Sequence, residues 1–562
     1  MLPVPSHSQG PFHQERLAAE ALAREAGVKL RAEFHRPGGP RGAQQDCPAD
    51  REVELLLRTR LAALFPQYGV RGEEARELNL PPPQPGGLSW IIDPNDGTAA
   101  FIQGWRGPTV CIGLAGRQGP VLGVIYSYLE RCGHGDLLSW AQGEALLRNG
   151  QPLTPPLAPA PLVISPVADV LPDALLAPLP HPFVCTPGTA WRLALAAAGD
   201  ARTAVTCSNP KEWDLAAGHA LLTGAGRSLH LMAGGLPVYD EVAPRFGDCA
   251  AGENQPSLHL ATLDWTWLRC GLPEHRQPLD PILPAPGLAL DDPPSLARAC
   301  GCLVGMLTGD NLGATLPGHR RLLPGQPTEL GEAALLLGRR LAGSAYFVRG
   351  LDGQGGLDGQ GGLDGQGLLL AVPLALYLAP RGLPAVAAAA RAQALAGGAD
   401  PLAADACAAL AVGLACALQG ETTPQAIHYN TLDFARSAGL AAAVLGALKA
   451  APQAPLTSHP GADLPALDAL QNAFFQLLHS GGPVQALEGT CGLGGQTSLL
   501  GASALALMGA ARGLLDLPRH WTLAVLACRA LPGTPWPRPR HLRPTDALVL
   551  AERLLIRGRA DS

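Results

Sequence analysis

Residues 90–101 place an apolar run, two acids and a Gly-Thr pair in one short stretch. The sequence reads Trp-Ile-Ile-Asp-Pro-Asn-Asp-Gly-Thr-Ala-Ala-Phe. The apolar run predicts a strand, and the Pro-Asn turn after it brings the carboxylates of Asp93 and Asp96 toward one hard divalent cation such as Mg²⁺. The backbone N–H groups of Gly97 and Thr98 would lie at a helix N-terminus, where phosphate binds readily. A D-x-x-D pattern alone is also common on solvated turns.

Two further acidic segments strengthen the interpretation as a metal site. Glu73 and Glu74 end a predicted strand that follows a helical run over 51–64. Downstream, Glu212-Trp213-Asp214 places an acid at the predicted N-cap of an apolar helix, where the helix dipole favours negative charge. Three acidic segments, each beside a strand or helix boundary, favour a two-metal phosphate site over three coincidental caps.

Together these segments resemble the inositol monophosphatase family of Mg²⁺-dependent, lithium-sensitive phosphatases. The family motifs G-E-E, D-P-(I/L)-D-G-T and W-D-x-A-A-G are similar to residues 72–74, 93–98 and 213–218, in the same order. The match extends to Asp50, to a strand at 123–126 and to Gly188-Thr189-Ala190, and it covers about the first half of the chain. The resemblance implies an α/β fold of the layered αβαβα sandwich type for residues 1–270.

The resemblance also implies roles for single residues. The Mg²⁺ ligands would be four carboxylates and one main-chain carbonyl: Glu73, Asp93, Asp96, Asp214 and the carbonyl of Asn95. The phosphate would be held by Gly97, Thr98, Gly188 and Thr189. Glu73 and the Thr98 hydroxyl would act in catalysis by orienting the attacking water. Glu74 would support the metal ligands without binding the metal itself. Asp50 is open between a structural acid at a helix start and a role near a weaker metal.

Three departures from the family pattern bear on the substrate. Asn95 stands where the family has Ile or Leu, and Ala100 stands where it has Asn; neither change removes the metal ligands. Inositol-specific members place a carboxylate about seven residues before the third motif, whereas residues 207–211, Cys-Ser-Asn-Pro-Lys, contain no acid. The substrate is therefore open between an inositol phosphate, a sugar phosphate and a nucleotide-type ester.

Composition limits the remaining possibilities. A chain of 562 residues should hold two or more domains, and a formal net charge of −6 gives no basic surface for nucleic acid. The first residues lack the pattern of a signal peptide, so a cytoplasmic location is expected. The 13 cysteines contain no C-x-x-C pair and are expected to be buried thiols. The apolar run 499–508 is too short to cross a membrane and should be a core helix.

The character of the sequence changes after Trp267. Residues 271–294 are proline-rich, which suits a linker. Beyond it, Ala and Leu recur at helical spacing, and strand signals are almost absent, so residues 295–562 are predicted to form an all-α domain. The helical segments are 334–341, 385–395, 403–418, 435–448, 464–478 and 498–515. A six-residue Leu-Asp-Gly-Gln-Gly-Gly repeat over 350–367 is interpreted as a flexible loop rather than a calcium-binding repeat.

This second half resembles the ADP-ribosylglycohydrolases. Residues 301–314 are similar to their G-x-x-x-G-x-x-x-G-D-x-x-G opening, and 365–374 and 492–497 match two later segments. Those enzymes bind two Mg²⁺ through T-D-D and D-x-D-T, where this chain has Thr328-Glu329-Leu330 and Gly494-Gly495-Gln496-Thr497. Because so few carboxylates remain, a catalytically degenerate domain is favoured over a remodelled active one. Asp310 is then expected to be a turn or cap residue.

The sequence thus predicts a Mg²⁺-dependent phosphatase acting on a small phosphorylated metabolite, with a non-catalytic helical partner domain. An apolar Ala/Leu surface on the helical half could join two copies into a homodimer. Neither a nucleic acid nor a membrane is expected as a partner. The alternative is a non-enzymatic sensor of a nucleotide or an ADP-ribose-like molecule. The four acids Glu73, Asp93, Asp96 and Asp214 discriminate between the two, since a retired phosphatase would be expected to have lost at least one of them.

Overall fold

The computed structural model describes the chain except for residues 1–9, 45, 75–86, 132, 134, 154–159, 178, 180–181, 240–245, 271–283, 316–321, 344–365, 457–464 and 562. The chain divides into two compact units. Unit 1 comprises residues 1–130, 134–279 and 285–289, and unit 2 comprises 131–133, 280–284 and 290–562. Most of the predicted linker and of the six-residue repeat lies outside the described residues.

A seven-stranded sheet forms the centre of unit 1. Its strands follow one another in chain order: β1 (Gly69–Gly72), β2 (Ser89–Asp96), β3 (Thr109–Gly116), β4 (Gly119–Ser127), β5 (Asp136–Ala141), β6 (Leu147–Arg148) and β7 (Gln151–Pro152). Only β1 and β2 are parallel, with Gly72 opposite Ile92. The C-terminal ends of these two strands therefore reach the same edge of the sheet. Glu73 directly follows β1, and Asp93 and Asp96 lie in the C-terminal half of β2.

Unit 1 also contains a second, five-stranded sheet. Its order is β11-β12-β10-β8-β9. The strands are β8 (Leu162–Ile164), β9 (Phe183–Cys185), β10 (Thr203–Thr206), β11 (Ser228–Leu231) and β12 (Cys249–Gly252).

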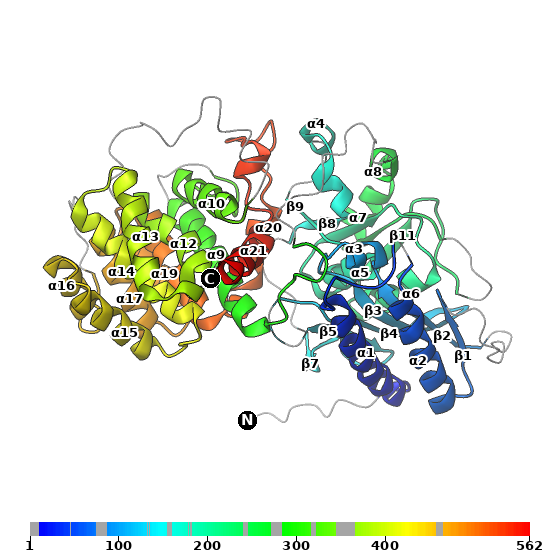
Figure 1. Ribbon diagram of the computed structural model, residues 1–562. Coiled ribbons are helices and arrows are strands. Elements are labelled where there is room, and N and C mark those ends of the chain that lie inside the picture. Colours follow the sequence, from blue (N-terminus) through cyan, green and yellow to red (C-terminus); the bar gives the residue numbers. More distant parts are fainter. Residues whose placement is uncertain are drawn as a thin grey trace, which may run out of the picture. The chain divides into compact units, whose positions relative to one another are not determined.

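Helices fill the layers around the two sheets of unit 1 (Figure 1). The helices α1 (His13–Phe34) and α2 (Pro48–Leu64) pack on one face of the first sheet. Between the sheets lie α5 (Thr189–Ala198) and α6 (Glu212–Gly224), and α7 (Asn254–Ala261) packs on the second sheet. Three short helices complete the unit: α3 (Thr98–Ile102), α4 (Asp173–Leu176) and α8 (Thr266–Cys270). The layered αβαβα prediction is confirmed.

Small residues let α6 lie close against the first sheet. A Cβ added to Gly123 would lie 2.3 Å from the carbonyl oxygen of Ala217, and one added to Gly113 would lie 3.0 Å from Cβ of Ala216. Neither contact could be made with larger side chains, because interiors pack without spare volume. The Ala-Ala-Gly part of the third motif thus seats the helix whose first turn carries Asp214.

Unit 2 is all-α over the residues that the structure describes. Its helices are α9 (Pro293–Ala314), α10 (Glu329–Leu341), α12 (Ala371–Leu378), α13 (Leu383–Ala396), α14 (Pro401–Leu418), α15 (Pro424–Ser437), α16 (Ala442–Ala450), α17 (Pro465–His479), α18 (Pro483–Cys491), α19 (Thr497–Arg512), α20 (Arg519–Ala527) and α21 (Ala547–Ala560). One of them, α14, is long and apolar enough to cross a membrane, but 78% of it is buried inside the protein, as in a core helix. The predicted core helix around 499–508 is confirmed as α19.

Two local predictions are wrong. The helical segment 435–448 is split into α15 and α16, because Gly439 adopts a left-handed φ of 68° and the N–H of Leu440 donates to the carbonyl of Ala435. The N-cap of α6 is Lys211 rather than an acid, and Asp214 acts from the third position of the helix. The other helical segments of unit 2 agree with the sequence pattern.

A row of glycines brings α9 and α19 into backbone contact. Cβ atoms added to Gly301, Gly305, Gly309 and Gly313 would lie 2.1–2.4 Å from carbonyl oxygens of Gly509, Leu505, Gly501 and Thr497, respectively. These distances are shorter than any real contact, so only glycine fits. The G-x-x-x-G-x-x-x-G pattern of the sequence is therefore a helix-packing device at the centre of unit 2.

We expect Gly309→Ala to destabilise unit 2 by about 2 kcal/mol or more, because its new Cβ would force two helix backbones apart. The matched control is Gly446→Ala on α16, where an added Cβ meets nothing within 4 Å and alanine is the better helix former. Chemical denaturation of the two variants measures the difference. Equal stability of both variants would contradict the packing argument.

Candidate active site

Three carboxylates converge at the edge of the first sheet. Asp93 and Asp96 stand at the end of β2, and Asp214 stands in the first turn of α6. One oxygen from each lies within 4.8 Å of one from each of the other two. Asp93 is 1% exposed and Asp96 is 6% exposed. Asp93 and Asp214 are 121 residues apart in the sequence, and the fold brings them together.

Backbone N–H groups hold the three carboxylates. The N–H of Asn95 donates to Oδ1 of Asp93 at 2.9 Å, that of Ala190 donates to Oδ2 of Asp96 at 2.6 Å, and that of Lys211 donates to Oδ2 of Asp214 at 2.6 Å. The other oxygen of Asp93, Oδ2, is buried and has no hydrogen-bond partner among the described residues. Such an oxygen is costly to bury, so it indicates a missing ligand.

Without a bound cation, the negative charges of these acids repel one another. Burial raises the pKa of Asp214 to about 7, and the charge of Asp96 adds to the effect. Burial and then the charge of Asp214 raise the pKa of Glu73 to about 8. The pKa of Asp93 is raised well above its usual value by burial, with Glu73 and Asp96 contributing. Like charges gathered in a low-dielectric site oppose one another's ionisation.

This arrangement fits a hard divalent cation. A cation bound to Asp93, Asp96 and Asp214 would neutralise their repulsion and give Asp93 Oδ2 its missing partner. Oxygen-only ligands of this kind are those that Mg²⁺ prefers. Glu73 is half-buried beside them, since the charges of Asp214 and Asp96 act on it, and it lies outside the 4.8 Å cluster. Its role as a fourth carboxylate ligand stays a prediction.

Asp50 is joined to this site by its hydrogen bonds. Its Oδ2 accepts from the Thr98 hydroxyl at 2.7 Å, and its Oδ1 accepts from the Asn95 side-chain amide at 3.0 Å. The side chain is fully buried, and burial raises its pKa to about 7. Asp50 also stands in the first turn of α2, which fits a structural acid at a helix start. A role near a weaker metal stays a prediction.

The residues predicted to hold phosphate lie side by side. Gly97 has a φ of 108°, and a Cβ added to it would lie 3.5 Å from the backbone N of Gly188, which itself has a φ of 78°. The Thr189 hydroxyl accepts from Arg192 at 3.2 Å. The first turn of α5 already donates to Asp96 through Ala190. A phosphate role for Gly97, Thr98, Gly188 and Thr189 stays a prediction.

Two residues near the site were missed at the level of sequence. Arg192 is 3% exposed, and its guanidinium donates to the Thr186 carbonyl at 3.0 Å and to the Thr189 and Thr206 hydroxyls. A single arginine inside an Ala/Leu helix was the available signal. Tyr128 is 1% exposed and donates to Oδ1 of Asn95. No sequence signal pointed to it.

The corresponding place in unit 2 is filled by hydrogen bonds. Asp310 on α9 is fully buried and accepts from the backbone N–H and the hydroxyl of Thr328, both at 2.7 Å, and from the Ser498 hydroxyl at 2.5 Å. Thr328 is the N-cap of α10, so Asp310 ties three helices together. Gly494 and Gln496, which stand where the family has carboxylates, are exposed. The expectation that Asp310 is a cap-type residue agrees with these contacts.

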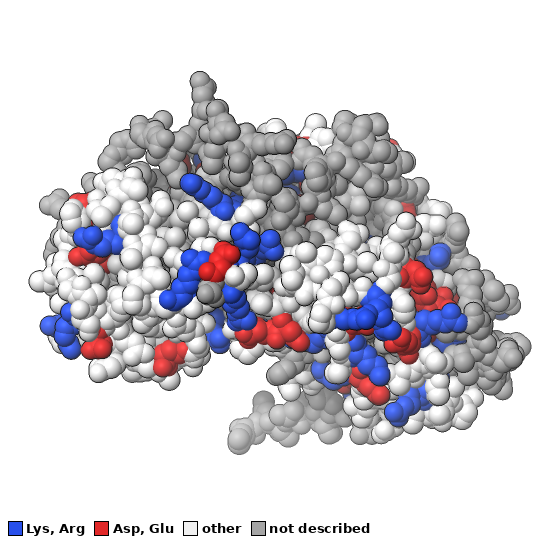
Figure 2. Space-filling model, in the orientation of Figure 1, with Lys and Arg blue, Asp and Glu red and all other residues white. Residues whose placement is uncertain are grey.

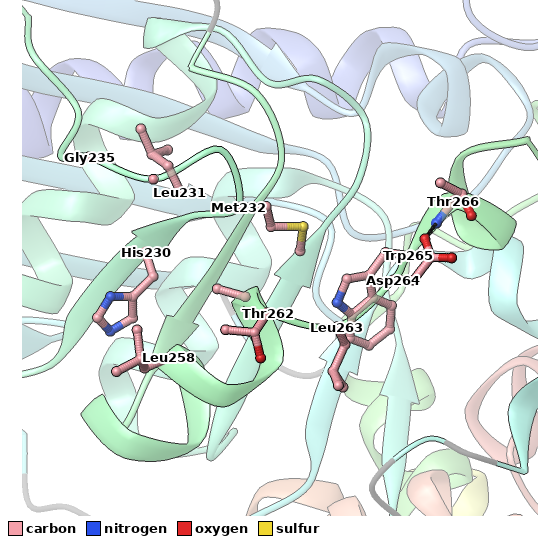
Figure 3. Close-up of a pocket in the computed structure, with 12 residues that line it drawn as sticks. His230, Leu231, Met232, Gly235, Leu258, Thr262, Leu263, Asp264, Trp265 and Thr266 are labelled. Carbon is pink, nitrogen blue, oxygen red and sulfur yellow. Dashed lines mark hydrogen bonds between the residues drawn. The ribbon is translucent and has the colours of Figure 1, made fainter.

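A separate pocket opens in unit 1 beside β11 and α7 (Figure 3). It has a volume of about 460 Å³ and is lined by residues 230–232, 234–235, 258 and 261–266. In the close-up, His230 and Leu258 lie on one side and Trp265 on the other. None of the clustered acids lines it. The chemistry of the acid cluster therefore does not extend to this pocket.

We expect the metal-free protein to lose stability as the pH rises from about 4 to about 8. The folded-state pKa values of Asp214 and Glu73 lie above their unfolded values, so the folded state binds more protons and its advantage disappears as these groups ionise. In chelator, the melting temperature should fall by about 5 °C between pH 5 and pH 8. Added Mg²⁺ should restore more stability at pH 8 than at pH 5. A melting curve that rises with pH in chelator would contradict this.

Comparisons with known proteins agree with the two-part organisation. Residues 13–263 match the model of the inositol monophosphatase family, and residues 319–560 match the model described as ADP-ribosylglycohydrolase. The histidinol-phosphatase of Chlorobaculum parvum is 39% identical over 106 residues, which are 19% of this chain and 38% of the relative. The 3'(2'),5'-bisphosphate nucleotidase CysQ of Aggregatibacter actinomycetemcomitans is 35% identical over 109 residues, which are 19% of this chain and 40% of the relative.

Among solved structures, an inositol monophosphatase from Anabaena (Nostoc) sp. has 23% sequence identity and a TM-score of 0.36, and the match covers 45% of this chain and 95% of that one. The chain spans about two fifths of the length of the two curated relatives named above. The chain joins a segment of the inositol monophosphatase family, residues 13–263, to a segment of the ADP-ribosylglycohydrolase family, residues 319–560.

Proposed function

We propose that unit 1 is a Mg²⁺-dependent phosphatase that hydrolyses a small phosphate monoester. The observation that carries this proposal is the convergence of three carboxylates, two buried and one partly buried, at the unpartnered Oδ2 of Asp93. Family membership of residues 13–263 supports it. The rival proposal, a non-enzymatic sensor, leaves this costly cluster without a purpose.

Each part of the site has a chemical task in this proposal. Asp93, Asp96, Asp214, Glu73 and the Asn95 carbonyl would hold the cations. Bound Mg²⁺ would supply charge neutralisation on the phosphoryl oxygens and a lowered pKa for the attacking water. Glu73 and the Thr98 hydroxyl would orient that water, and the backbone at Gly97 and Gly188 would position the ester.

Activity should require Mg²⁺ and should be lost in Asp93→Asn, which keeps the size of the side chain but removes a charge at the centre of the cluster. Phosphate release from a panel of esters measures this: inositol phosphates, sugar phosphates, histidinol phosphate and 3′-phosphoadenosine nucleotides. We expect a loss of more than about 100-fold. The variant should unfold cooperatively as the wild type does. Phosphate release that persists in excess chelator would contradict the proposal.

Lys211 narrows the proposed substrate class. The loop 207–211 carries no acid, and its lysine lies at the acid cluster, since its own backbone N–H donates to Asp214. The ammonium stands 5.2 Å from the centroid of the Trp213 ring. Its charge opposes the burial that raises the pKa of Glu73 and Asp214. A cation in this place favours an ester with a second anionic group, as in a bisphosphate nucleotide, over one with an ammonium group, as in histidinol phosphate.

Lys211→Met should lower kcat/KM for adenosine 3′,5′-bisphosphate by about tenfold or more and should change that for adenosine 3′-phosphate much less, because only the first ester offers Lys211 a second charged partner. Lys211→Arg is the control and should retain the preference. Steady-state kinetics of the three proteins on both esters measures it. Equal losses on both esters would mean that Lys211 acts only on the acid cluster.

For unit 2 we propose a non-catalytic role as a partner domain. The positions of the family's metal ligands carry Leu330, Gly494 and Gln496, and the retained Asp310 is satisfied by hydroxyl and N–H donors. We also propose a cytoplasmic location, and no nucleic-acid or membrane partner. On the face drawn in Figure 2, basic and acidic side chains are interspersed over the described residues rather than gathered in one basic surface.

Mg²⁺-dependent cleavage of ADP-ribose from modified arginine or serine should be undetectable in the full chain, because unit 2 lacks the carboxylates that would balance two divalent cations. Asp310→Ala should instead lower the melting temperature, since it leaves the donors of Thr328 and Ser498 unpaired. Chromatographic detection of released ADP-ribose and thermal unfolding measure the two outcomes. Glycohydrolase activity that disappears in Asp310→Ala would contradict this proposal.

A further inference from the structure

A continuous chain of buried hydrogen bonds runs behind the acid cluster. It links four elements of unit 1: Tyr128 just after β4, Asn95 in β2, Asp50 in α2 and Thr98 in α3. The Tyr128 hydroxyl donates to Oδ1 of Asn95, and Nδ2 of Asn95 donates to Oδ1 of Asp50 at 3.0 Å. From the other side, the Thr98 hydroxyl donates to Oδ2 of Asp50 at 2.7 Å.

When Asp50 is ionised, the direction of every donor in this chain is determined. An ionised carboxylate only accepts hydrogen bonds, so Asp50 requires the NH₂ end of the Asn95 amide. The carbonyl end of that amide then faces Tyr128, whose hydroxyl must donate. Tyr128 therefore selects one orientation of the Asn95 side chain, and that orientation holds one oxygen of Asp50.

Burial makes this bridge hard to replace. Asp50 and Asn95 are fully buried, and Tyr128 is 1% exposed. Water cannot readily take the place of a missing partner at such positions, so a group that loses its donor or acceptor must rotate or stay unsatisfied. A change at Tyr128 should therefore be transmitted to Asp50.

Thr98 has two acceptors within reach for its single hydroxyl proton. Asp50 Oδ2 lies at 2.7 Å, and the main-chain carbonyl oxygen of Asn95 lies at 3.2 Å. Hydrogen bonds to a carboxylate are shorter and stronger than those to a neutral carbonyl, so a correctly placed Asp50 attracts the proton. The Asn95 carbonyl then keeps its lone pairs for the cation, and the Thr98 oxygen keeps its own to accept a hydrogen bond from water.

The bridge depends on a feature of this chain. Asn95 occupies the place where the inositol monophosphatase motif has Ile or Leu, and an aliphatic side chain can neither accept from Tyr128 nor donate to Asp50. Replacing Ile or Leu by Asn leaves the main-chain carbonyl in place as a metal ligand. The Asn95 side chain adds the two hydrogen bonds of the bridge.

We propose that Asn95 and Tyr128 are positioning residues that act through Asp50 to keep the Thr98 proton away from the Asn95 carbonyl. The inference rests on the proposed phosphatase function, because its consequence is a correctly directed Thr98 hydroxyl and a free carbonyl ligand at the metal site. Neither residue needs to touch the substrate for this role.

The test uses the full chain with Mg²⁺ and the best ester of the panel, and it compares Tyr128→Phe with Tyr239→Phe. Tyr239 is a matched control, since it is also 1% exposed and its hydroxyl bonds to Nδ1 of His219, outside the bridge. Tyr128→Phe should lower kcat about tenfold and leave KM within about twofold, because remote support of a metal site typically contributes this much. Tyr239→Phe should leave kcat unchanged even where it lowers the melting temperature.

A double-mutant cycle separates a bridge from two independent contributions. Asn95→Leu removes the middle of the chain, so Tyr128→Phe should have no further effect on kcat in that background. Neutron crystal structures of the metal-free proteins locate hydroxyl protons and give a readout besides activity. In Tyr128→Phe, the Thr98 proton should point to the Asn95 carbonyl instead of to Asp50. Mg²⁺ affinity measured by calorimetry should fall about tenfold in the same variant.

The outcomes distinguish this inference from the proposed function. A wild-type chain that is inactive on every ester would overturn the phosphatase proposal and the inference with it. An active wild type would overturn the inference alone if Tyr128→Phe retained full kcat, or if its effect were the same in the wild-type and Asn95→Leu backgrounds. The inference alone would also be overturned if the Thr98 hydroxyl still donated to Asp50 in the neutron crystal structure of Tyr128→Phe.

Discussion

The mutual repulsion of three closely placed carboxylates, two buried and one partly buried, determines how unit 1 must be built. Asp93, Asp96 and Asp214 bring oxygens within 4.8 Å of one another, and such a cluster is unfavourable unless something opposes it. The fold provides a backbone N–H for each acid, from Asn95, Ala190 and Lys211. It leaves Oδ2 of Asp93 without a partner among the described residues. The scaffold thus stabilises the charges only in part, and a cation would complete it.

The need to bring these acids together and to stabilise their charges explains the arrangement of the strands and helices around the cluster. The parallel pair β1 and β2 brings two acidic loops to one sheet edge, although all other neighbours in that sheet are antiparallel. The glycines of β3 and β4 let α6 approach closely enough to add Asp214. The buried Arg192 on α5 contributes a positive charge that lowers the pKa of Asp96 against the effect of burial. Sequence, packing and electrostatics here act on the same few atoms.

The convergence of Asp93, Asp96 and Asp214 could be predicted because these residues lie in short motifs beside strand and helix ends. Glu73, Asp93 and Asp214 could be placed by local pattern, and so could the layered fold that the motifs imply. The Tyr128 contact could not, since Tyr128 and Asn95 are 33 residues apart and meet only through the register of three strands. The break between α15 and α16 was missed for a different reason. Ala and Leu continue the helical period across it, and one left-handed glycine overrides that period.

The two units show opposite treatments of a fully buried aspartate. Asp310 receives two donors from Thr328 and one from Ser498, so its charge is satisfied by neutral groups among the described residues. Asp93 receives one N–H and lies among other carboxylates. Both side chains are expensive to bury, but only the second remains incompletely paired. The retained aspartate of unit 2 therefore serves helix packing, and Asp93 is left poised to bind a metal.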